Sequence, residues 1–287
     1  MKKIKYLLRS FVHYFDKKNC SYCGNNEFMV IKKKYFITTL VECTNCFLRY
    51  RIPKDKLSYL QKFYQSEYKV ANQLMTTFPT PAELKVLKDS NFKGIRDYYM
   101  EVIKKIVKSK DLKIIDYGCS WGYFVYKMKN IGLDSAGFEL SKIRSKYGED
   151  NLGIKIYTQD AEIRNGNDIF FSSHVIEHIL NLNEHFSLVK EKLSSDGFMV
   201  SFCPNGSEEF RNRNPLLYDQ TWGNLHPNYI SIPFLQSVFS KHPYAIFTGD
   251  DNFDLQKIAN WDEKSQYVDD YKEGYELLII TKPNYAY

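Results

Sequence analysis

Four cysteines with paired spacing are the residues in the first part of the chain most suited to chemistry. Cys20 and Cys23 form one Cys-x-x-Cys pair, and Cys43 and Cys46 form another after 19 intervening residues. This spacing is typical of four-cysteine zinc sites, in which two tight turns supply four thiolates to one tetrahedral ion. Because no coordination position stays open, we expect a structural zinc ion whose binding helps this small segment to fold. The two matched pairs favour this role over a redox role.

A second candidate site begins where an apolar stretch ends in an acid. Residues 113–124 read KIIDYGCSWGYF, which predicts a buried strand, a loop containing Gly118 and Gly122, and the start of a helix. In open α/β sheets such a loop lies at the carboxyl ends of the strands, where ligands bind. Glu139 follows the next predicted strand and could accept hydrogen bonds from both hydroxyls of a ribose. Asp160, after a third strand, could hold an adenine amino group.

This stretch resembles the cofactor-binding part of class I S-adenosylmethionine-dependent methyltransferases, over about residues 111–204. Gly118, Ser120 and Gly122 stand at the positions of the family's Gly-x-Gly-x-Gly loop, with a small serine in place of the middle glycine. The resemblance implies S-adenosylmethionine as cofactor, with Asp116 beside its methionine part and the two downstream acids on its ribose and adenine. The residues that the resemblance assigns to the cofactor are Asp116, Gly118, Cys119, Ser120, Gly122, Tyr123, Phe124, Glu139, Leu140, Asp160, Ala161, Ser173, His174 and His178.

Two further segments fit the same resemblance. Residues 168–178, DIFFSSHVIEH, look like the family's fourth strand followed by a Glu-His pair, and residues 195–200, SDGFMV, look like its turn into the fifth strand. An NAD-binding loop would need a glycine where Tyr123 stands, and a phosphate-binding P-loop would need a Gly-Lys-Ser/Thr sequence. Neither alternative fits this loop.

The methyl acceptor is expected beyond the fourth and fifth strands, beside the long segment 204–229. Methylation of a hydroxyl needs a general base, and His226, in the sequence WGNLHPNY, is the predicted base. The alternative role for His226 is to hold the loop together. His174 and His178 are expected to shape the cofactor pocket instead.

The second cysteine pair and the residues after it carry another resemblance. Residues 43–68 resemble the knuckle and aromatic helix that precede the methyltransferase domain in bacterial sugar and surface-polysaccharide methyltransferases. This implies a small glycosyl acceptor, linked to a nucleotide or a lipid. Related sugar C-methyltransferases carry Tyr-His-Glu-His in the acceptor loop, and His226 matches only the last position, which favours O-methylation. Phe210, Trp222 and Tyr229 would form an apolar wall against the sugar or else belong to the core.

Charge is unevenly distributed along the chain. Residues 1–64 hold 14 Lys and Arg against four acids, a net +10 in a chain whose total is +6. One alternative function is therefore an RNA methyltransferase whose zinc module grips phosphates; a solvated basic face would look the same. Against RNA, the fourth strand is followed by Ser172-Ser-His rather than an Asn-Pro-Pro-Tyr type of motif. A cofactor-binding scaffold without enzymatic activity is the third interpretation.

Residues 2–16 form an apolar helical stripe with basic residues on the other face. The stripe consists of Ile4, Leu7, Leu8, Phe11, Val12 and Phe15. Such a helix either docks on its own domain or lies on an anionic membrane surface. Since no stretch approaches the roughly 20 apolar residues of a membrane span, we expect a cytoplasmic protein, with peripheral contact at the inner membrane face as the alternative.

The elements that must position these residues alternate between strand and helix from residue 112 onward. Strands are predicted at 112–117, 135–138, 154–157, 168–172, 197–203, 244–248 and 276–281. This alternation predicts an α/β fold with a doubly wound sheet, which the resemblance specifies as a seven-stranded, Rossmann-like methyltransferase sheet. The expected units are an amphipathic helix at 1–16, a zinc-ribbon-like module at 17–54, a helical linker or lid at 55–110 and the methyltransferase domain at 111–287.

Overall fold

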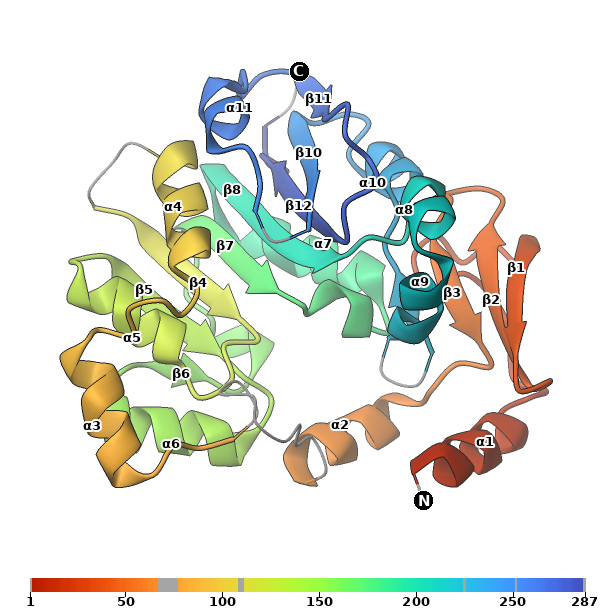
Figure 1. Cartoon of the computed structure of the whole chain (residues 1–287), viewed down its shortest axis with the longest axis horizontal. Coiled ribbons are helices and arrows are strands. Elements are labelled where there is room, and N and C mark those ends of the chain that lie inside the picture. Colours follow the sequence, from red (N-terminus) through yellow and green to blue (C-terminus); the bar gives the residue numbers. More distant parts are fainter. Residues whose placement is uncertain (1, 67–76, 108–110, 224–225, 251, 286–287) are drawn as a thin grey trace.

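The largest element of the fold is an eight-stranded sheet (Figure 1). The computed structural model describes residues 2–66, 77–107, 111–223, 226–250 and 252–285. The sheet has the order β11-β10-β12-β8-β7-β4-β5-β6. Its strands are β4 (Lys113–Tyr117), β5 (Asp134–Phe138), β6 (Ile156–Tyr157), β7 (Asn167–Ser173), β8 (Leu193–Pro204), β10 (Tyr244–Gly249), β11 (Gln266–Val268) and β12 (Glu276–Thr281).

The topology of this sheet is doubly wound. β4 lies in the middle, with β5 and β6 on one side and β7 and β8 on the other, all parallel. β12 is inserted antiparallel between β8 and β10. The strand order reverses between β4 and β7, and in such sheets ligands bind outside the carboxyl ends of the strands at that point. The expected Rossmann-like fold is thus confirmed, with the short β11 as an additional edge strand.

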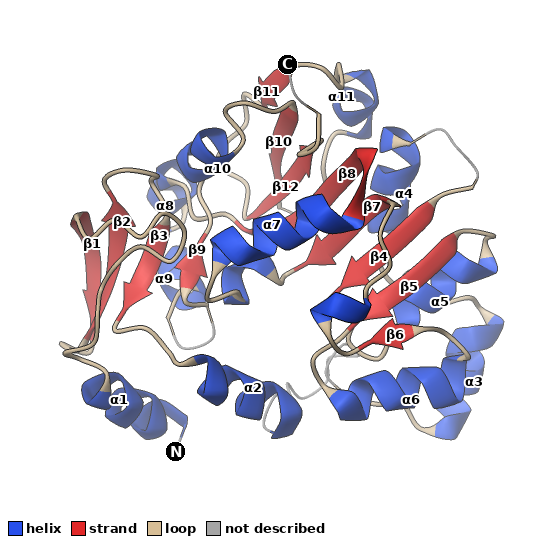
Figure 2. Cartoon of the chain, turned by 180° about the vertical axis from the view of Figure 1, so that it is seen from behind, coloured by secondary structure: helices blue, strands red, loops and turns tan. Residues whose placement is uncertain are grey.

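Helices cover both faces of the sheet, because alternate strand residues point to opposite sides. Ile114 and Ile115, for example, belong to two separate core clusters. One face carries α3 (Pro81–Asp89), α4 (Asp97–Ile106), α5 (Tyr123–Asn130), α6 (Lys142–Leu152) and α11 (Leu255–Asn260). The other face carries α7 (Leu182–Lys192) and α10 (Ile232–Val238), seen in front of the sheet in Figure 2. α3 begins after the cap Thr80, which forms a capping box with Glu83.

The cysteine module is a smaller antiparallel sheet that includes part of the predicted acceptor loop. Its order is β1-β2-β3-β9, with β1 (Phe28–Lys34), β2 (Thr38–Cys43), β3 (Arg49–Ile52) and β9 (Asn228–Tyr229). The buried Arg49 of β3 links the module to the predicted acceptor loop, because it pairs with Glu42 at 2.7 Å and with Glu208 at 3.0 Å. It also donates to the carbonyl of Gly206 and to the hydroxyl of Tyr218. The module is therefore joined to segment 204–229, which also contains α8 (Glu208–Arg213) and α9 (Pro215–Thr221).

Helix α1 (Lys2–Val12) docks on the cysteine module, and α2 (Leu57–Ser66) follows the module in the chain. Tyr6 and Ser10 are buried, and Arg9 pairs with Asp55 at 2.6 Å. Most of the predicted apolar stripe nevertheless faces outward; Ile4, Leu8, Phe11, Val12 and Phe15 are exposed. The last residues of the predicted aromatic helix, 67 and 68, lie outside the described residues.

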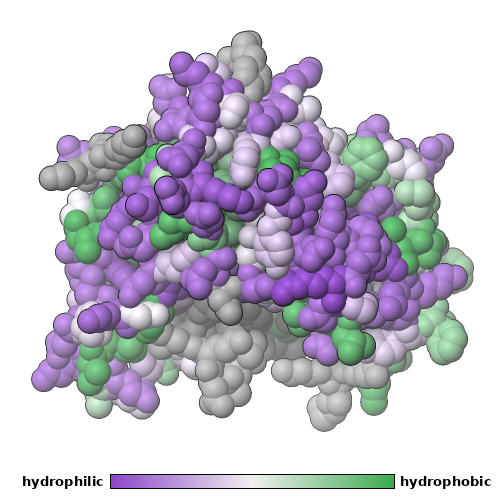
Figure 3. Space-filling view, turned by 45° about the horizontal axis from the view of Figure 1, so that its top comes forward, coloured by the Kyte–Doolittle hydropathy of each residue, from purple (hydrophilic) through white to green (hydrophobic). Residues whose placement is uncertain are grey.

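The surface of the molecule is mixed in character. The face shown in Figure 3 is mainly hydrophilic, with apolar side chains in small separate groups. Among the described residues, no helix combines the length and apolarity that crossing a bilayer requires.

Candidate active site

The loop between β4 and α5 has a backbone conformation that requires small residues. Gly118, Ser120 and Gly122 have φ angles of 82°, 55° and 81°. A Cβ atom on Gly118 would lie 2.5 Å from Val175 Cγ2, and one on Gly122 would lie 2.2 Å from Ile154 Cδ1. Each of these two positions therefore requires glycine for two reasons: the positive φ angle and the lack of space for a Cβ atom. Ser120 adopts the left-handed conformation despite its side chain, at a cost of about 1 kcal/mol, at the position where the resemblance places a glycine.

Asp116, the last acid of β4, is a buried carboxylate with an unused hydrogen-bond acceptor. Its side chain is 1% exposed, and its Oδ2 has no hydrogen-bond partner in the described part of the chain. Burial raises the pKa of Asp116 to about 7, against the influence of the Arg96 guanidinium and with a smaller contribution from Glu139. A cationic ligand beside Asp116 would supply the missing partner and favour the charged form of the carboxyl.

Glu139 connects the glycine loop to the end of β5. Its Oε2 accepts a hydrogen bond from the Ser120 amide at 3.1 Å, and its Oε1 accepts one from the Ser141 amide at 2.8 Å. Burial raises the pKa of Glu139, while these amides and Arg144 oppose the shift. Each carboxylate oxygen has two acceptor positions, so the capacity to accept two hydroxyl donors remains.

The other predicted cofactor residues around the pocket have different surroundings. Asp160 accepts a hydrogen bond from the Tyr117 hydroxyl at 3.0 Å. Leu140 is 43% exposed, and Ala161 is also exposed, so both side chains are accessible to a ligand. Gln65 of α2 donates to the carbonyl of Leu140 and thereby brings α2 to this edge of the sheet.

Three residues of the predicted set point into the protein interior. Cys119, Tyr123 and Phe124 are buried in the hydrophobic core beneath the loop. Their side chains support the loop from below, so any contact that they make with a ligand would come from the backbone.

A histidine and two acids lie at the end of β7, beside the loop of residues 118–122 between β4 and α5, which we call the donor loop. His174 Nε2 lies 2.8 Å from Glu276 Oε1, and its Nδ1 lies 3.5 Å from Glu177 Oε1. Burial would lower the pKa of His174, but the two carboxylates outweigh burial and raise it to about 9. Ser173 donates to the Tyr99 hydroxyl at 3.1 Å. The sequence analysis missed Glu276 and Tyr99, because β12 and α4 bring them from distant parts of the chain.

His226 lies next to the Glu-His pair after β7. Its ring centroid is 4.6 Å from that of His178, with the two rings edge to face. Its Nδ1 is hydrogen-bonded to the carbonyl of Thr221. Glu177, His178 and His226 each present one potential ligand atom, and these atoms lie within 4.8 Å of one another. The structure therefore brings the predicted base together with His178, while residues 224 and 225 lie outside the described part.

Three aromatic residues proposed for an acceptor wall belong to the core instead. Phe210, Trp222 and Tyr229 are at most 3% exposed and form a separate cluster with Tyr218. They support segment 204–229 from inside, which corresponds to the second of the two predicted roles.

The four cysteines converge as their spacing predicts. Cys20 Sγ lies 3.5 Å from Cys46 Sγ, Cys23 Sγ lies 3.5 Å from Cys43 Sγ, and all four sulfurs are within 4.8 Å of one another. A tetrahedron with zinc–sulfur bonds of about 2.3 Å has sulfur–sulfur edges of about 3.8 Å, so the arrangement fits the ion. The residue after each pair, Gly24 or Phe47, has a positive φ, which gives the two turns the same backbone reversal.

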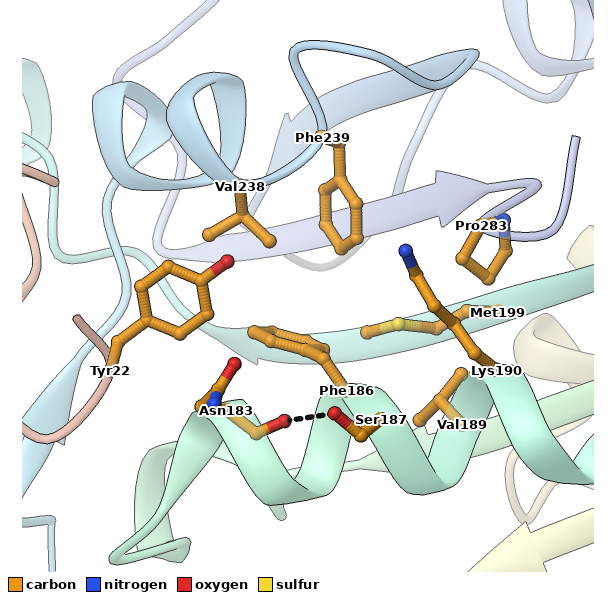
Figure 4. Close-up of a pocket in the computed structure, with 10 residues that line it drawn as sticks. All are labelled: Tyr22, Asn183, Phe186, Ser187, Val189, Lys190, Met199, Val238, Phe239 and Pro283. Atoms are coloured by element: carbon orange, nitrogen blue, oxygen red, sulfur yellow. Dashed lines mark hydrogen bonds between the residues drawn. The ribbon is translucent and has the colours of Figure 1, made fainter. Parts of the chain in front are cut away.

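The first cysteine turn packs against the larger sheet through an aromatic residue. Tyr22 contacts Phe186 and Phe234 edge to face, with ring centroids 6.1 and 5.3 Å away. Tyr22 and Phe186 border a small pocket between the cysteine module, α7 and α10 (Figure 4). None of the residues lining this pocket belongs to the donor loop, so we assign the pocket no part in the chemistry.

The fold and the loop define a Rossmann-like α/β protein. The sequence matches no protein-family model and no curated protein. Among solved structures, it is similar to a TehB-like SAM-dependent methyltransferase from Corynebacterium glutamicum, with 13% identity over 70% of this chain and 98% of that one and a TM-score of 0.45. A SAM-dependent methyltransferase from Archaeoglobus fulgidus is 17% identical over 69% and 98%, with a TM-score of 0.44. The plantazolicin methyltransferase BpumL, solved with a pentazolic desmethylPZN analogue and SAH, is 15% identical over 73% and 93%, with a TM-score of 0.46. At such values the function must be argued from this chain's own site.

Proposed function

We propose that the protein is an S-adenosylmethionine-dependent methyltransferase. The observation that carries the proposal is the pair of buried acids at the glycine loop. Asp116 Oδ2 accepts no hydrogen bond in the described part of the chain, and Glu139 is fixed by the amides of Ser120 and Ser141 with capacity left for hydroxyl donors. S-adenosylmethionine carries an ammonium and a sulfonium cation at one end and a ribose with two adjacent hydroxyls next to them. Its charges and donors complement this pocket.

The buried Asp116 argues against a dinucleotide as the ligand. A dinucleotide-binding loop places an anionic pyrophosphate at the start of the helix after the first strand. Here the strand before that helix carries the buried Asp116. Its carboxylate would repel a pyrophosphate, whereas it attracts a cationic donor. Glu139 does not discriminate between the two ligands, because an acid at this place binds the ribose of a dinucleotide as well.

For the acceptor, we extend the proposal to a hydroxyl of a glycosyl group, linked to a nucleotide or a lipid. A hydroxyl must lose its proton as it accepts the methyl group. Glu177, His178 and His226 form a polar cluster at the end of the strand next to β4, beside the donor loop, and this supports an acceptor that needs activation. The sugar itself is supported by the resemblance of the cysteine module and its aromatic helix to those of sugar methyltransferases.

The cysteine site is proposed to hold structural zinc. Cys43 ends β2, Cys46 precedes β3, and β3 pairs with β9. Since β9 begins two residues after His226, a metal that fixes the knuckles also fixes the end of the loop that carries this histidine. Two basic residues of the module form ion pairs within the protein: Arg49 with Glu208, and Lys32 with Asp219. Side chains paired in this way are less available to RNA phosphates, which weakens the RNA-binding alternative.

The test is transfer of labelled methyl from S-adenosylmethionine to a panel of nucleotide-linked and lipid-linked sugars, with RNA as a competing acceptor. We expect label on a sugar hydroxyl that RNA-degrading treatments do not release, and reduced transfer by a Glu139→Gln variant when the donor is below saturation. Label found only on RNA would favour the alternative function. No label on any acceptor, together with no donor binding, would contradict a methyltransferase.

A further inference from the structure

Two segments far apart in sequence bring a carboxylate and two imidazoles to one point. Glu177 and His178 lie in the short helical turn η2 (Ile176–His178) after β7, and His226 lies just before β9. One ligand atom from each lies within 4.8 Å of the others, with His178 Nε2 3.9 Å from Glu177 Oε1. Three atoms at such separations can all reach a single ion at bond lengths of about 2.0–2.2 Å after small side-chain rotations.

Glu177 lacks the hydrogen bonds that a buried carboxylate normally makes. Its side chain is fully buried, and neither oxygen has a hydrogen-bond partner in the described part of the chain. Its Oε1 lies 3.5 Å from His174 Nδ1 and 3.9 Å from His178 Nε2, so both imidazoles are close but neither forms a hydrogen bond with it. A buried carboxylate that lacks hydrogen bonds is costly, and a bound cation would occupy its vacant lone pairs.

The surroundings of His226 orient it as a ligand. Its Nδ1 is hydrogen-bonded to the carbonyl of Thr221. A carbonyl can only accept, so Nδ1 carries the hydrogen and Nε2 is left with a lone pair. Thr221 is itself fixed, because its hydroxyl is hydrogen-bonded to the hydroxyl of Tyr229 and to the carbonyl of Tyr218. A histidine held by a carbonyl through its other nitrogen is the usual arrangement around protein-bound metals.

We infer that Glu177, His178 and His226 form a second metal site, separate from the cysteines, for a divalent first-row transition cation. Two imidazole nitrogens and one carboxylate oxygen suit manganese, iron, cobalt or zinc. Three protein ligands leave coordination positions open, which distinguishes this site from the closed four-cysteine site. The role of this metal site rests on the proposed function. The cation would bind and polarise the oxygen of the methyl acceptor, and His226 would be a metal ligand rather than a general base.

The position of the site agrees with that purpose. Val175, immediately before η2, packs so closely on Gly118 that a Cβ there would lie 2.5 Å from its side chain. The turn that contacts the donor loop therefore also carries Glu177 and His178. An acceptor oxygen bound at this cluster would lie on the side of the loop where the methyl group is expected.

The test uses manganese as the probe, because a hard cation prefers nitrogen and oxygen ligands and does not compete for the thiolates. Zinc-loaded full-length protein is titrated with Mn²⁺, and the loss of the free Mn²⁺ signal in electron paramagnetic resonance reports binding. Glu177→Gln keeps the size of the side chain and removes its charge, and His226→Ala removes a ligand at a less buried position. His242→Ala is the matched control, since His242 contacts Tyr285 and Lys190 instead.

We expect one Mn²⁺ per chain in the unmodified protein and in His242→Ala. Both ligand variants should raise the dissociation constant by at least about tenfold, with unchanged circular dichroism and zinc content showing that they are folded. The absence of Mn²⁺ binding, or binding that survives both ligand substitutions, would overturn the second metal site. Calorimetric titration with S-adenosylhomocysteine separates the two claims: donor binding without Mn²⁺ binding refutes only this site, and Mn²⁺ binding without donor binding refutes the proposed function.

Discussion

Replacing Asp116 by asparagine should stabilise the protein and abolish its affinity for the donor. The ordinary pKa of an aspartate is 3.8, and burial raises that of Asp116 to about 7. The folded state holds the proton of Asp116 more tightly than the unfolded state does. The contribution of this proton to the free energy of unfolding is therefore complete below pH 4 and is lost as the pH rises through 7. About three pKa units at 1.36 kcal/mol each give a penalty of roughly 4 kcal/mol at pH 8. Asparagine avoids this penalty because it carries no charge.

The assay is urea unfolding of the zinc-loaded protein at pH 5 and pH 8, followed through the fluorescence of tryptophan. We expect the asparagine variant to gain on the order of 2–4 kcal/mol at pH 8 and much less at pH 5. Asp150→Asn is the control, because this carboxylate is exposed and its substitution should change stability by less than about 0.5 kcal/mol. A variant that is less stable than the parent at pH 8, or that binds the donor as well as the parent does, would refute the argument.

Further predictions concern the donor pocket, the metal and the contact between the module and the loop. Donor affinity, measured by calorimetry, should fall as the pH drops below 7, where Asp116 takes up a proton; a flat profile would separate this acid from the donor. Glu139→Gln should weaken donor binding by about 1–3 kcal/mol, because hydrogen bonds to a charged acceptor are lost, and unchanged affinity would remove Glu139 from the site. Cys43→Ser should lower the zinc content below one equivalent by elemental analysis and unfold the module; a full equivalent would rule out the four-cysteine site. Arg49→Met leaves Glu42 without its partner and should cost about 3–5 kcal/mol, seen as a lower urea midpoint; an unchanged midpoint would show that Arg49 does not hold the module in place.

Local sequence patterns were sufficient to predict the frame of the fold. The strand that carries Asp116, the two loop glycines and the helix that starts after them depend on contacts within a few residues. The cysteine spacing was equally informative, because two tight turns limit where four sulfurs can meet. These features are encoded by neighbouring residues, and the structure contains them where they were expected.

The parts that could not be predicted depend on chain segments that meet only in the folded state. His174 pairs with Glu276 across about a hundred residues, and the sequence gives no sign of it. β9 is two residues long, too short for a periodic pattern, and exists because it pairs with β3. His178 and His226 likewise come from distant segments that meet only in the folded chain. The sequence showed Ser120 in place of a glycine, but its left-handed conformation could be seen only in the structure.

The central claim is that the bend after β4 binds a sulfonium donor through Asp116 and Glu139. The most direct test is calorimetric titration of the zinc-loaded protein with S-adenosylhomocysteine, with NAD⁺ titrated in parallel. We predict one S-adenosylhomocysteine per chain, weakened by Glu139→Gln, and no heat of binding with NAD⁺. Binding of NAD⁺ in place of S-adenosylhomocysteine, or of neither ligand, would contradict this account of the site.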